Sequence, residues 1–469
     1  MIYRDLSNLK SPFVSAVTGL VLGLCCFFSE PSAFAVEAGG QLRLGAYSRS
    51  VEFEKPLNTE TSNDEKVYSA QLRMSIYDFS SHDDSIVTDI RDKVDSYGKL
   101  DTQNLTLDTY NRVQVRELAY KRPWESNQFY FTLGRFSLNE ANVLDNDGLE
   151  AGYRFSHNSR LGLFGGQAPK DVITPYYVDP TVTSNVNNAQ AGVYYSYEKK
   201  NGLDRSLYTN NALAMGPTYN ITDKQSHTYF YHMALWNLST NNRISSYLQQ
   251  DFMPTSSLRR ASVSHSYYDP SFRTNVSLSQ TNTEDYLIQK DILDPLPPSA
   301  EQSLRFDLRH RIFSQLSLDY SAGLSKRTVD GKSMNDLALG VIVQKALIAT
   351  GSFRAQYGIR KNYFSNDRYV RGGYDYWNQY FSLSIMHTVS TETYDAQTSV
   401  INGIAKNDRQ VTNLDGGFYF GDRFRGSLGY QREKDDKLSA SAFFLMLGYR
   451  FGKGTVAPVR TKPALFEEI

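Results

Sequence analysis

The stretch at residues 441–451, SAFFLMLGYRF, constrains the fold more than any other part of the sequence. In a β-strand, side chains point alternately to the two faces, so residues two apart share a face. Arg450 lies on one face, one residue before the terminal aromatic. The opposite face is apolar and aromatic throughout, with Phe443, Leu445, Leu447, Tyr449 and Phe451. This pattern fits a strand between lipid and water better than a strand in a dry core.

The same alternation recurs along the chain, with few convincing helical stretches. Leu42, Leu44 and Ala46 open the series. Further apolar faces, which we expect to face lipid, consist of Tyr68, Ala70, Leu72, Met74 and Ile76; Leu149, Ala151, Tyr153 and Phe155; Ala191, Val193, Tyr195 and Tyr197; Tyr229, Tyr231, Met233 and Leu235; and Leu304, Phe306 and Leu308. Similar stretches occupy residues 316–324, 337–343, 349–359, 381–385 and 411–420. Since a tilted strand of about 9 to 11 residues crosses a membrane, the series predicts membrane-spanning strands.

Linker lengths give a second signal. Tight linkers such as residues 156–160, 269–271 and 421–423 alternate with long polar segments at residues 52–66, 96–111, 167–190, 281–301 and 388–408. Long extracellular loops and short periplasmic turns are typical of a closed, antiparallel, up-and-down transmembrane β-barrel, in which a single bacterial chain has an even number of strands. We expect an all-β barrel of about 18 to 22 strands, with 22 as the best count, which requires a short strand at residues 369–376.

The first 35 residues form a predicted secretory signal peptide. Arg4 and Lys10 precede an uncharged apolar run at residues 13–28, and Ala33-Phe34-Ala35 offers a cleavage site. A signal anchor is the weaker alternative, because 16 apolar residues are short of the roughly 20 that a spanning helix needs. The two cysteines, Cys25 and Cys26, lie inside the segment to be removed. The mature chain would therefore have no disulfide, thiolate metal site or cysteine nucleophile.

Composition excludes several classes of protein. The chain has 50 basic and 50 acidic residues, so no electrostatic case for nucleic acid exists. The mean hydropathy is negative, which argues against a helical membrane protein. Yet the chain carries 33 tyrosines and 26 phenylalanines. Such aromatic loading fits a barrel with aromatic girdles at both membrane interfaces. A secreted β-sandwich or solenoid fits the composition as well, but not the terminal strand.

The spacing of Leu447, Tyr449 and Phe451 resembles the C-terminal signal of bacterial outer-membrane β-barrel proteins, with Phe451 as the closing aromatic. The resemblance implies insertion by the barrel-assembly machinery into outer-membrane lipid. The tail at residues 452–469 departs from the family, whose members usually end at the aromatic. We therefore divide the chain into a signal peptide (1–35), a barrel (36–451) and a periplasmic tail (452–469) that could bind a periplasmic partner.

Charged residues on the polar faces point to the interior of the barrel. The predicted lumen-lining residues are Arg73, Arg91, Lys93, Arg112, Arg116, Arg154, Arg305, Asp307, Arg309 and Arg354. Acidic neighbours on the same faces are Asp89, Asp95, Glu150 and Asp319. Rings of arginine and lysine select anions, so one interpretation is a weakly anion-preferring pore. The alternative is cross-strand pairing that stiffens the wall.

No catalytic, cofactor or metal site is expected. Residues 144–150, LDNDGLE, lack the oxygen ligands that an EF-hand needs on either side, so Asn146-Asp147-Gly148 is better interpreted as a turn before a strand. The histidines show no metal-binding spacing, and we expect His232 and His387 to face the lumen. His265 beside Ser264 or Ser266 is the weak candidate for a membrane-embedded lipase.

The sequence therefore predicts an outer-membrane barrel that resembles diffusion porins and passes small hydrophilic solutes or ions. The alternative is a sheath for a partner, such as a periplasmic multihaem cytochrome supplied by another chain. Ion conductance in planar bilayers would separate the two functions. Two long loops, at residues 167–190 and 281–301, contain three prolines each. We expect one of them to fold into the lumen, the alternative being an exposed receptor surface.

Overall fold

The structure is a computed structural model that describes residues 37–53, 62–77, 83–97, 110–169, 189–201, 204–217, 226–253, 256–282, 300–328, 330–395, 405–421, 423–436 and 438–452. The predicted signal peptide and nearly all of the tail lie outside these residues. The strands are β1 (Glu37–Phe53), β2 (Ser62–Tyr77), β3 (Ser85–Tyr97), β4 (Tyr110–Arg122), β5 (Phe129–Leu138), β6 (Val143–Arg154), β7 (Ser159–Gln167), β8 (Ala189–Asn201), β9 (Asp204–Pro217), β10 (Ser226–Asn237), β11 (Asn242–Met253), β12 (Ser257–Tyr268), β13 (Phe272–Asn282), β14 (Ala300–Arg311), β15 (Leu316–Arg327), β16 (Ser333–Gln344), β17 (Gly351–Lys361), β18 (Ser365–Trp377), β19 (Phe381–Tyr394), β20 (Lys406–Phe420), β21 (Phe424–Lys434) and β22 (Leu438–Gly452). A single 3₁₀ turn, η2 (Asn139–Ala141), connects β5 to β6 in the described chain.

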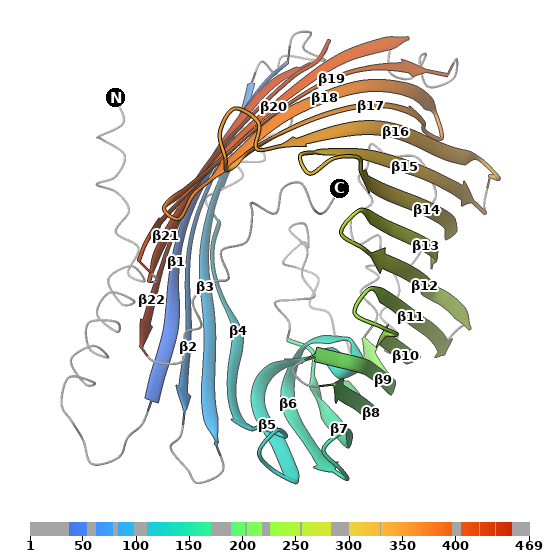
Figure 1. The fold of residues 1–469 in the computed structure, drawn as a ribbon. Helices are drawn as coiled ribbons and strands as arrows, with labels where there is room; N and C mark the ends of the chain where they lie inside the picture. Colours follow the sequence, from blue (N-terminus) through green and yellow to red (C-terminus); the bar gives the residue numbers. More distant parts are fainter. Residues whose placement is uncertain are drawn as a thin grey trace, which may run out of the picture.

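The 22 strands form one closed antiparallel barrel. Each strand pairs with its neighbours in sequence, and β1 pairs with β22 from Gly39↔Gly452 to Phe53↔Leu438. Figure 1 shows the strands as a ring around a central space. The predicted count of 22 is confirmed, and the short strand expected at residues 369–376 is the 13-residue β18.

The two ends of the barrel differ. Because the strand number is even, β1 starts and β22 finishes at the same end, which we call the turn end. The five long linkers expected from the sequence follow β1, β3, β7, β13 and β19, so all of them start at the opposite end, the loop end. The strands extend further than predicted: residue 52 belongs to β1 and residues 62–66 to β2. The turn proposed at Asn146-Asp147-Gly148 is wrong, because all three residues lie within β6.

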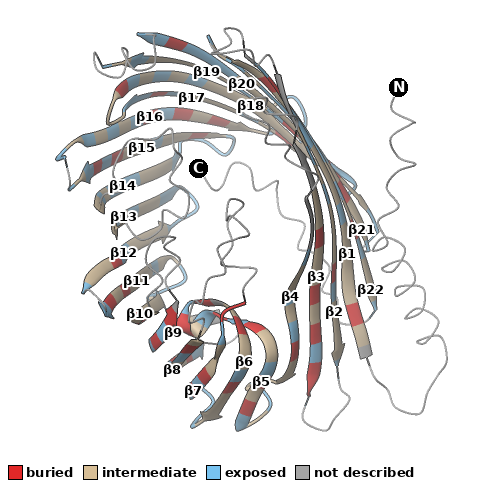
Figure 2. Cartoon of the chain, turned by 180° about the vertical axis from the view of Figure 1, so that it is seen from behind, coloured by how far each residue is buried: buried red, intermediate tan, exposed pale blue. Residues whose placement is uncertain are grey.

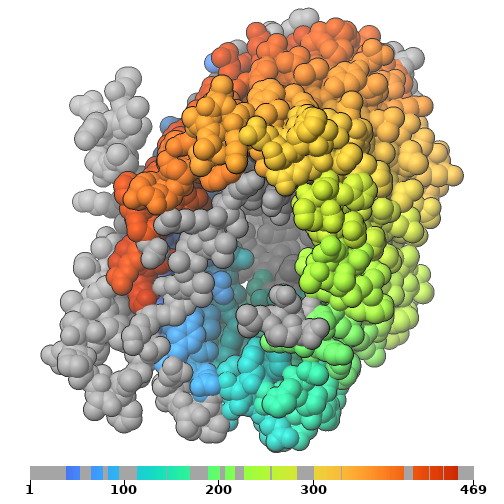
Figure 3. Space-filling view, viewed as in Figure 1, coloured from blue at the N-terminus to red at the C-terminus, as the bar shows by residue number. Residues whose placement is uncertain are grey.

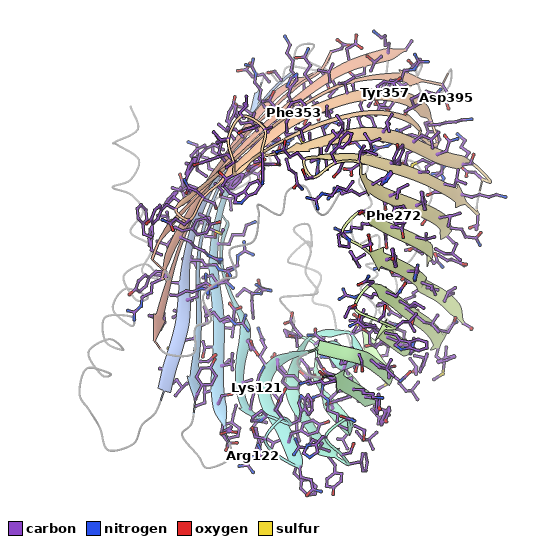
Figure 4. The ribbon with its side chains drawn as sticks, viewed as in Figure 1. Lys121, Arg122, Phe272, Phe353, Tyr357 and Asp395 are labelled. Atoms are coloured by element: carbon purple, nitrogen blue, oxygen red, sulfur yellow. The ribbon has the colours of Figure 1, made fainter. Side chains whose placement is uncertain are left out.

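The outward face of the wall is apolar. Leu44 lies opposite Leu447 on β22 and Ala70 on β2, so the apolar faces of neighbouring strands are in register. Phe353 and Tyr357 both lie on the outward face of β17, with Ala355 between them (Figure 4). At the turn end, the ring centroids of Phe129 on β5 and Tyr153 on β6 are 4.8 Å apart, and those of Tyr153 and Phe155, two residues later in the chain, are 5.2 Å apart. This arrangement is that of an aromatic girdle at a membrane interface.

The tip of the β5–β6 hairpin leaves the wall and bends into the barrel. β5 pairs with β4 only from Arg122↔Phe131 to Leu118↔Arg135, whereas it continues to pair with β6 as far as Leu138↔Val143. Gly134 permits the departure: its φ is +118°, and a Cβ there would lie 2.2 Å from the backbone oxygen of Leu118. We call residues 136–146 the hairpin tip.

The hairpin tip packs against the inner faces of β7 to β11. Phe136 is 1% exposed and Ala141 is fully buried. They belong to one buried cluster that consists of Ala119, Tyr130, Phe136, Leu138, Ala141, Val143, Phe164, Tyr194, Ala212, Ala214, Tyr229 and Tyr231. The buried residues gather around β5 to β9 in Figure 2. This part of the interior, which we call the filled half, is therefore a packed core.

The filled half corrects one prediction. The face of Tyr229, Tyr231, Met233 and Leu235 was expected to meet lipid, but Tyr229 pairs with Ala214 and Tyr231 with Ala212, and all four residues are in the inward register. Phe230 and Trp236 of β10 point outward instead, with Trp236 half exposed. In the described residues, no helix is long and apolar enough to cross a membrane.

Candidate functional site

The inner wall of β12 to β18 forms the candidate site, which we call the arginine wall. It borders a concavity of about 660 Å³ whose charged lining residues are Arg273, Arg305, Asp307, Arg309, Asp319, Asp336, Arg354, Arg360 and Arg371. Six arginines therefore face three aspartates. Figure 3 shows the molecule hollowed at its centre beside the green and yellow strands that carry this wall. An excess of positive charge in a confined aqueous space raises the local concentration of anions.

Two of these arginines are paired with carboxylates. Arg309 on β14 lies directly opposite Asp319 on β15 and binds it in a bidentate manner, with distances of 2.7 and 3.2 Å. Arg305 donates to Asp307, two residues along the same strand, at 3.1 Å. These pairs hold the side chains against the wall. Only the Arg309–Asp319 pair connects two strands, as the wall-stiffening alternative requires, whereas Arg305 and Asp307 lie on the same strand.

Arg360 and Arg371 are arranged differently. The ring of Tyr369 lies between them, with the guanidinium carbons 5.8 and 5.7 Å from its centroid. Tyr369 lies over Gly358, whose missing side chain leaves room for the ring. Arg371 also donates to Thr388 at 3.4 Å, and in the described chain neither arginine has a carboxylate within ion-pair distance. Asp367 on β18 lies opposite Arg360, beyond ion-pair distance, so among the described residues neither guanidinium group is held in a direct salt bridge.

The polar lining continues onto β19 and β20. A smaller concavity of about 280 Å³ joins Arg360, Tyr369 and Arg371 to Thr388, Ser390, Arg409 and Asn413. Arg409 forms an ion pair with Glu433 on β21 at 2.7 Å. Asp367 also borders this concavity, so the arginine wall continues as a polar, hydrogen-bonding surface toward the seam between β1 and β22.

The remaining predicted lumen residues lie on β2, β3, β4, β6 and β17. The register places Arg73, Arg91 and Lys93 on the inward face, opposite Gln41, Gln71 and Ser69. Arg354 is inward on β17 and borders the arginine wall. Arg116 lies at a bulge between β3 and β4. Arg154 donates to the backbone oxygen of Glu125 at 2.5 Å, in the turn before β5. The side chains of Arg112 and Asp95 lie outside the described part of the structure.

The filled half contains a buried polar network that the sequence did not predict. Tyr194 donates to the carboxylate of Glu150, and the hydroxyl groups of Tyr130 and Tyr194 are 3.0 Å apart. Arg160 pairs with Glu140 of the hairpin tip, and its guanidinium lies 4.2 Å from the ring of Trp124. This network attaches the tip to β5, β6, β7 and β8. Only the fold brings these separate residues together.

The two predictions of lumenal histidines are wrong. His232 pairs with Asn211 and His387 with Thr412, and both are on the outward face, not in the lumen. Each forms hydrogen bonds with outward-facing neighbours, such as Asn211 at 2.9 Å and Thr412 at 2.8 Å. His265 points outward, whereas Ser264 and Ser266 point inward and bond to Ser245 and Asn275. No serine–histidine pair is formed there. The described residues contain no group of three or more metal-ligating side chains.

The predicted assembly signal lies at the turn end of β22. Leu447 pairs with Leu44 and Tyr449 with Leu42 on the outward face. The ring of Phe451 lies over Gly40, where a Cβ would be 2.5 Å from the ring. β22 ends at Gly452, one residue beyond the predicted boundary of the barrel. The remainder of the tail is outside the described residues.

No protein-family model matches the chain, and no curated protein matches it. Solved structures resemble it at low identity. OpdQ of Pseudomonas aeruginosa is 11% identical, with a TM-score of 0.42 over 89% of this chain and 98% of that one. The translocation pore of the P pilus usher PapC is 9% identical, with a TM-score of 0.45 over 87% and 99%. OccAB4 of Acinetobacter baumannii is 9% identical, with a TM-score of 0.40 over 90% and 100%.

The strand pairing itself defines the type of fold. The barrel is closed, its outward face is apolar with an aromatic girdle, and its inner wall is polar along β12 to β20. These are the properties of an outer-membrane barrel, in which lipid-facing and lumen-facing residues alternate. By its fold, the chain is a closed 22-stranded antiparallel β-barrel of the outer-membrane type.

Proposed function

We propose that the chain forms a passive channel for small hydrophilic solutes, with a weak preference for anions. The arginine wall carries the proposal, because six arginines and three aspartates border its concavity. Rings of arginine favour anions over cations in a narrow pore. The lining thus has three more arginines than aspartates, which gives a preference rather than strict selection.

The proposal includes an orientation in the cell. A cleaved signal peptide and the barrel-assembly machinery would deliver the chain to the outer membrane. The turn end, with Glu37 and Gly452, would lie in the periplasm, since short turns are periplasmic in bacterial barrels. The loop end would be extracellular. The tail after Gly452 would then be available to a periplasmic partner.

The filled half weighs against a sheath for an electron-transfer partner. Such a sheath needs an interior wide enough for a folded protein. Here the hairpin tip and its buried cluster occupy the interior beside β5 to β11. A solute that passes along the arginine wall does not need this space.

Reversal potentials in planar bilayers under a salt gradient test the proposal. The wild-type channel should conduct and show a small anion preference, and the double variant Arg360→Gln/Arg371→Gln should shift the reversal potential toward cations. The matched control is Arg309→Gln/Asp319→Asn, which removes an ion pair without changing the net charge and should leave the reversal potential nearly unchanged. Absence of conductance in a folded, inserted wild-type barrel would overturn the proposed function.

A further inference from the structure

The departure of the hairpin tip leaves part of β4 without a neighbour. β3 pairs with β4 from Tyr110 to Lys121 on one side. On the other side, β5 pairs only with the five residues from Leu118 to Arg122. In the described chain, no strand pairs with this second edge of β4 from Tyr110 to Glu117. We call this unpaired edge, together with the end of the β4–β5 ladder, the β4 seam.

The β4 seam begins within the thickness of the membrane. A tilted strand needs about 9 to 11 residues to cross the hydrocarbon region. The β4–β5 ladder has five residue pairs, counted from the turn end. Val113 is on the outward face of β4 beyond the ladder and is half exposed. The unpaired edge is therefore at a depth where other strands of the wall face lipid.

An unpaired strand edge has a strict physical consequence in a membrane. Each backbone N–H or C=O group without a partner in hydrocarbon costs several kcal/mol. Irregular backbone is tolerated at this depth only where it is covered by protein or lines a water-filled space. One of these backbone groups has a hydrogen-bond partner, because Nη1 of Arg135 donates to the backbone oxygen of Val115 at 2.7 Å. Water is the natural partner for the rest of the edge.

Charged and apolar groups meet where the β4–β5 ladder ends. Arg135 binds Asp147 with both Nε and Nη2, each at 2.6 Å. Exposed leucines surround this pair on the outward face: Leu118 beside Arg135, and Leu133 and Leu149 one step toward the turn end. A charged pair among lipid-facing leucines suits a ligand that has a polar head and an apolar chain.

We propose that the β4 seam is a water-filled lateral passage, through which a single-chain amphiphile moves between the lumen and the membrane leaflet at the loop end. Its head group would contact Arg135 and Asp147, and its chain would lie along Leu118 and Val113. The passage would be bordered by β4 on one side and by the departing hairpin on the other, where Arg135 and Asp147 are the last pair before the hairpin tip. This passage is independent of the anion preference of the arginine wall.

Cysteine labelling in lipid nanodiscs tests the passage. Val115→Cys is placed at the seam, and Leu44→Cys on the fully paired β1 is its control. Val115 is seven residues before Arg122, the last residue of β4, and Leu44 is seven residues after Glu37, the first of β1. Both side chains are in the outward register. The background carries Ser at Cys25 and Cys26. Val113→Cys replaces Val115→Cys if that variant fails to assemble.

A charged, membrane-impermeant thiol reagent should label Val115→Cys at least about tenfold faster than Leu44→Cys, because the reactive thiolate forms where water stabilises it. Dodecanoate should slow the labelling of Val115→Cys, whereas acetate should not. Equal, slow labelling at both positions would overturn the water-filled seam. Fast labelling that dodecanoate does not slow would overturn the amphiphile. Neither outcome bears on the reversal potential, so the proposed channel function is tested separately.

Discussion

The two halves of the barrel interior differ in how their space is used: one is filled by packed side chains, and the other borders concavities. A 22-stranded wall encloses more space than its own inward side chains can fill. Beside β5 to β11, the hairpin tip and a ring of buried aromatic residues fill the space. Beside β12 to β20, the wall keeps its polar side chains and borders concavities. We infer that β5 to β11 mainly stabilise the barrel, whereas β12 to β20 border the path of the solute. Substitutions in the two halves should therefore have different effects.

Truncation of Phe136 should give the largest loss of stability. The side chain is 1% exposed in the filled half, so Phe136→Ala should lower the free energy of unfolding by about 3–5 kcal/mol. Met334→Ala, on the arginine wall and only partly buried, is the control and should cost less. Urea titration of the barrel in detergent measures both. Equal losses would mean that the filled half is not a packed core.

Substitution of Gly134 should lower the free energy of unfolding by about 1–3 kcal/mol, because the backbone would be strained. Gly134→Ala places a Cβ against the backbone oxygen of Leu118 at a φ of +118°, so the hairpin tip cannot leave the wall at this point without rearrangement. Gly372→Ala is the control, because nothing lies within 4 Å of the added carbon. The same urea titration applies. A neutral Gly134→Ala variant would show that the tip departs elsewhere.

Removal of one hydroxyl group from the buried network should have an effect of similar size. Tyr194→Phe deprives Glu150 of one of its donors and Tyr130 of its hydroxyl partner, which should cost about 1–3 kcal/mol. Tyr357→Phe, on the outward face of β17, is the control and should be nearly neutral. Heat modifiability on gels reports the ranking. A Tyr194→Phe barrel as stable as the control would indicate that water replaces the lost donor.

The sequence predicts the wall well because alternation is a local property. The faces of Leu304, Phe306 and Leu308, and of Leu445 and Leu447, are outward as expected, since each strand shows its two environments in its own residues. Arg309 and Asp319 are also within reach of sequence reasoning, because strand alternation places both on polar faces of consecutive strands.

The interior of the filled half could not be predicted in the same way. Tyr229 and Tyr231 resemble girdle residues, because a tyrosine has an apolar ring and a polar end and suits either a core or an interface. What decides between them is the hairpin tip, whose Ala141 oxygen accepts a hydrogen bond from Tyr229 at 3.1 Å. That contact joins residues 88 apart in the chain. The tip leaves the wall at Gly134, and the alternation of polar and apolar residues in the sequence does not distinguish this glycine from others.

Single-channel conductance of a barrel without the hairpin tip tests the division of the interior most directly. Arg135 and Asp147 are directly paired, so an Asn-Gly turn can join them in place of residues 136–146. We expect a clear rise in conductance with little change in the reversal potential, because the filled half opens while the arginine wall is intact. Unchanged conductance in a folded variant would contradict the division of the barrel into a filled half and a conducting half.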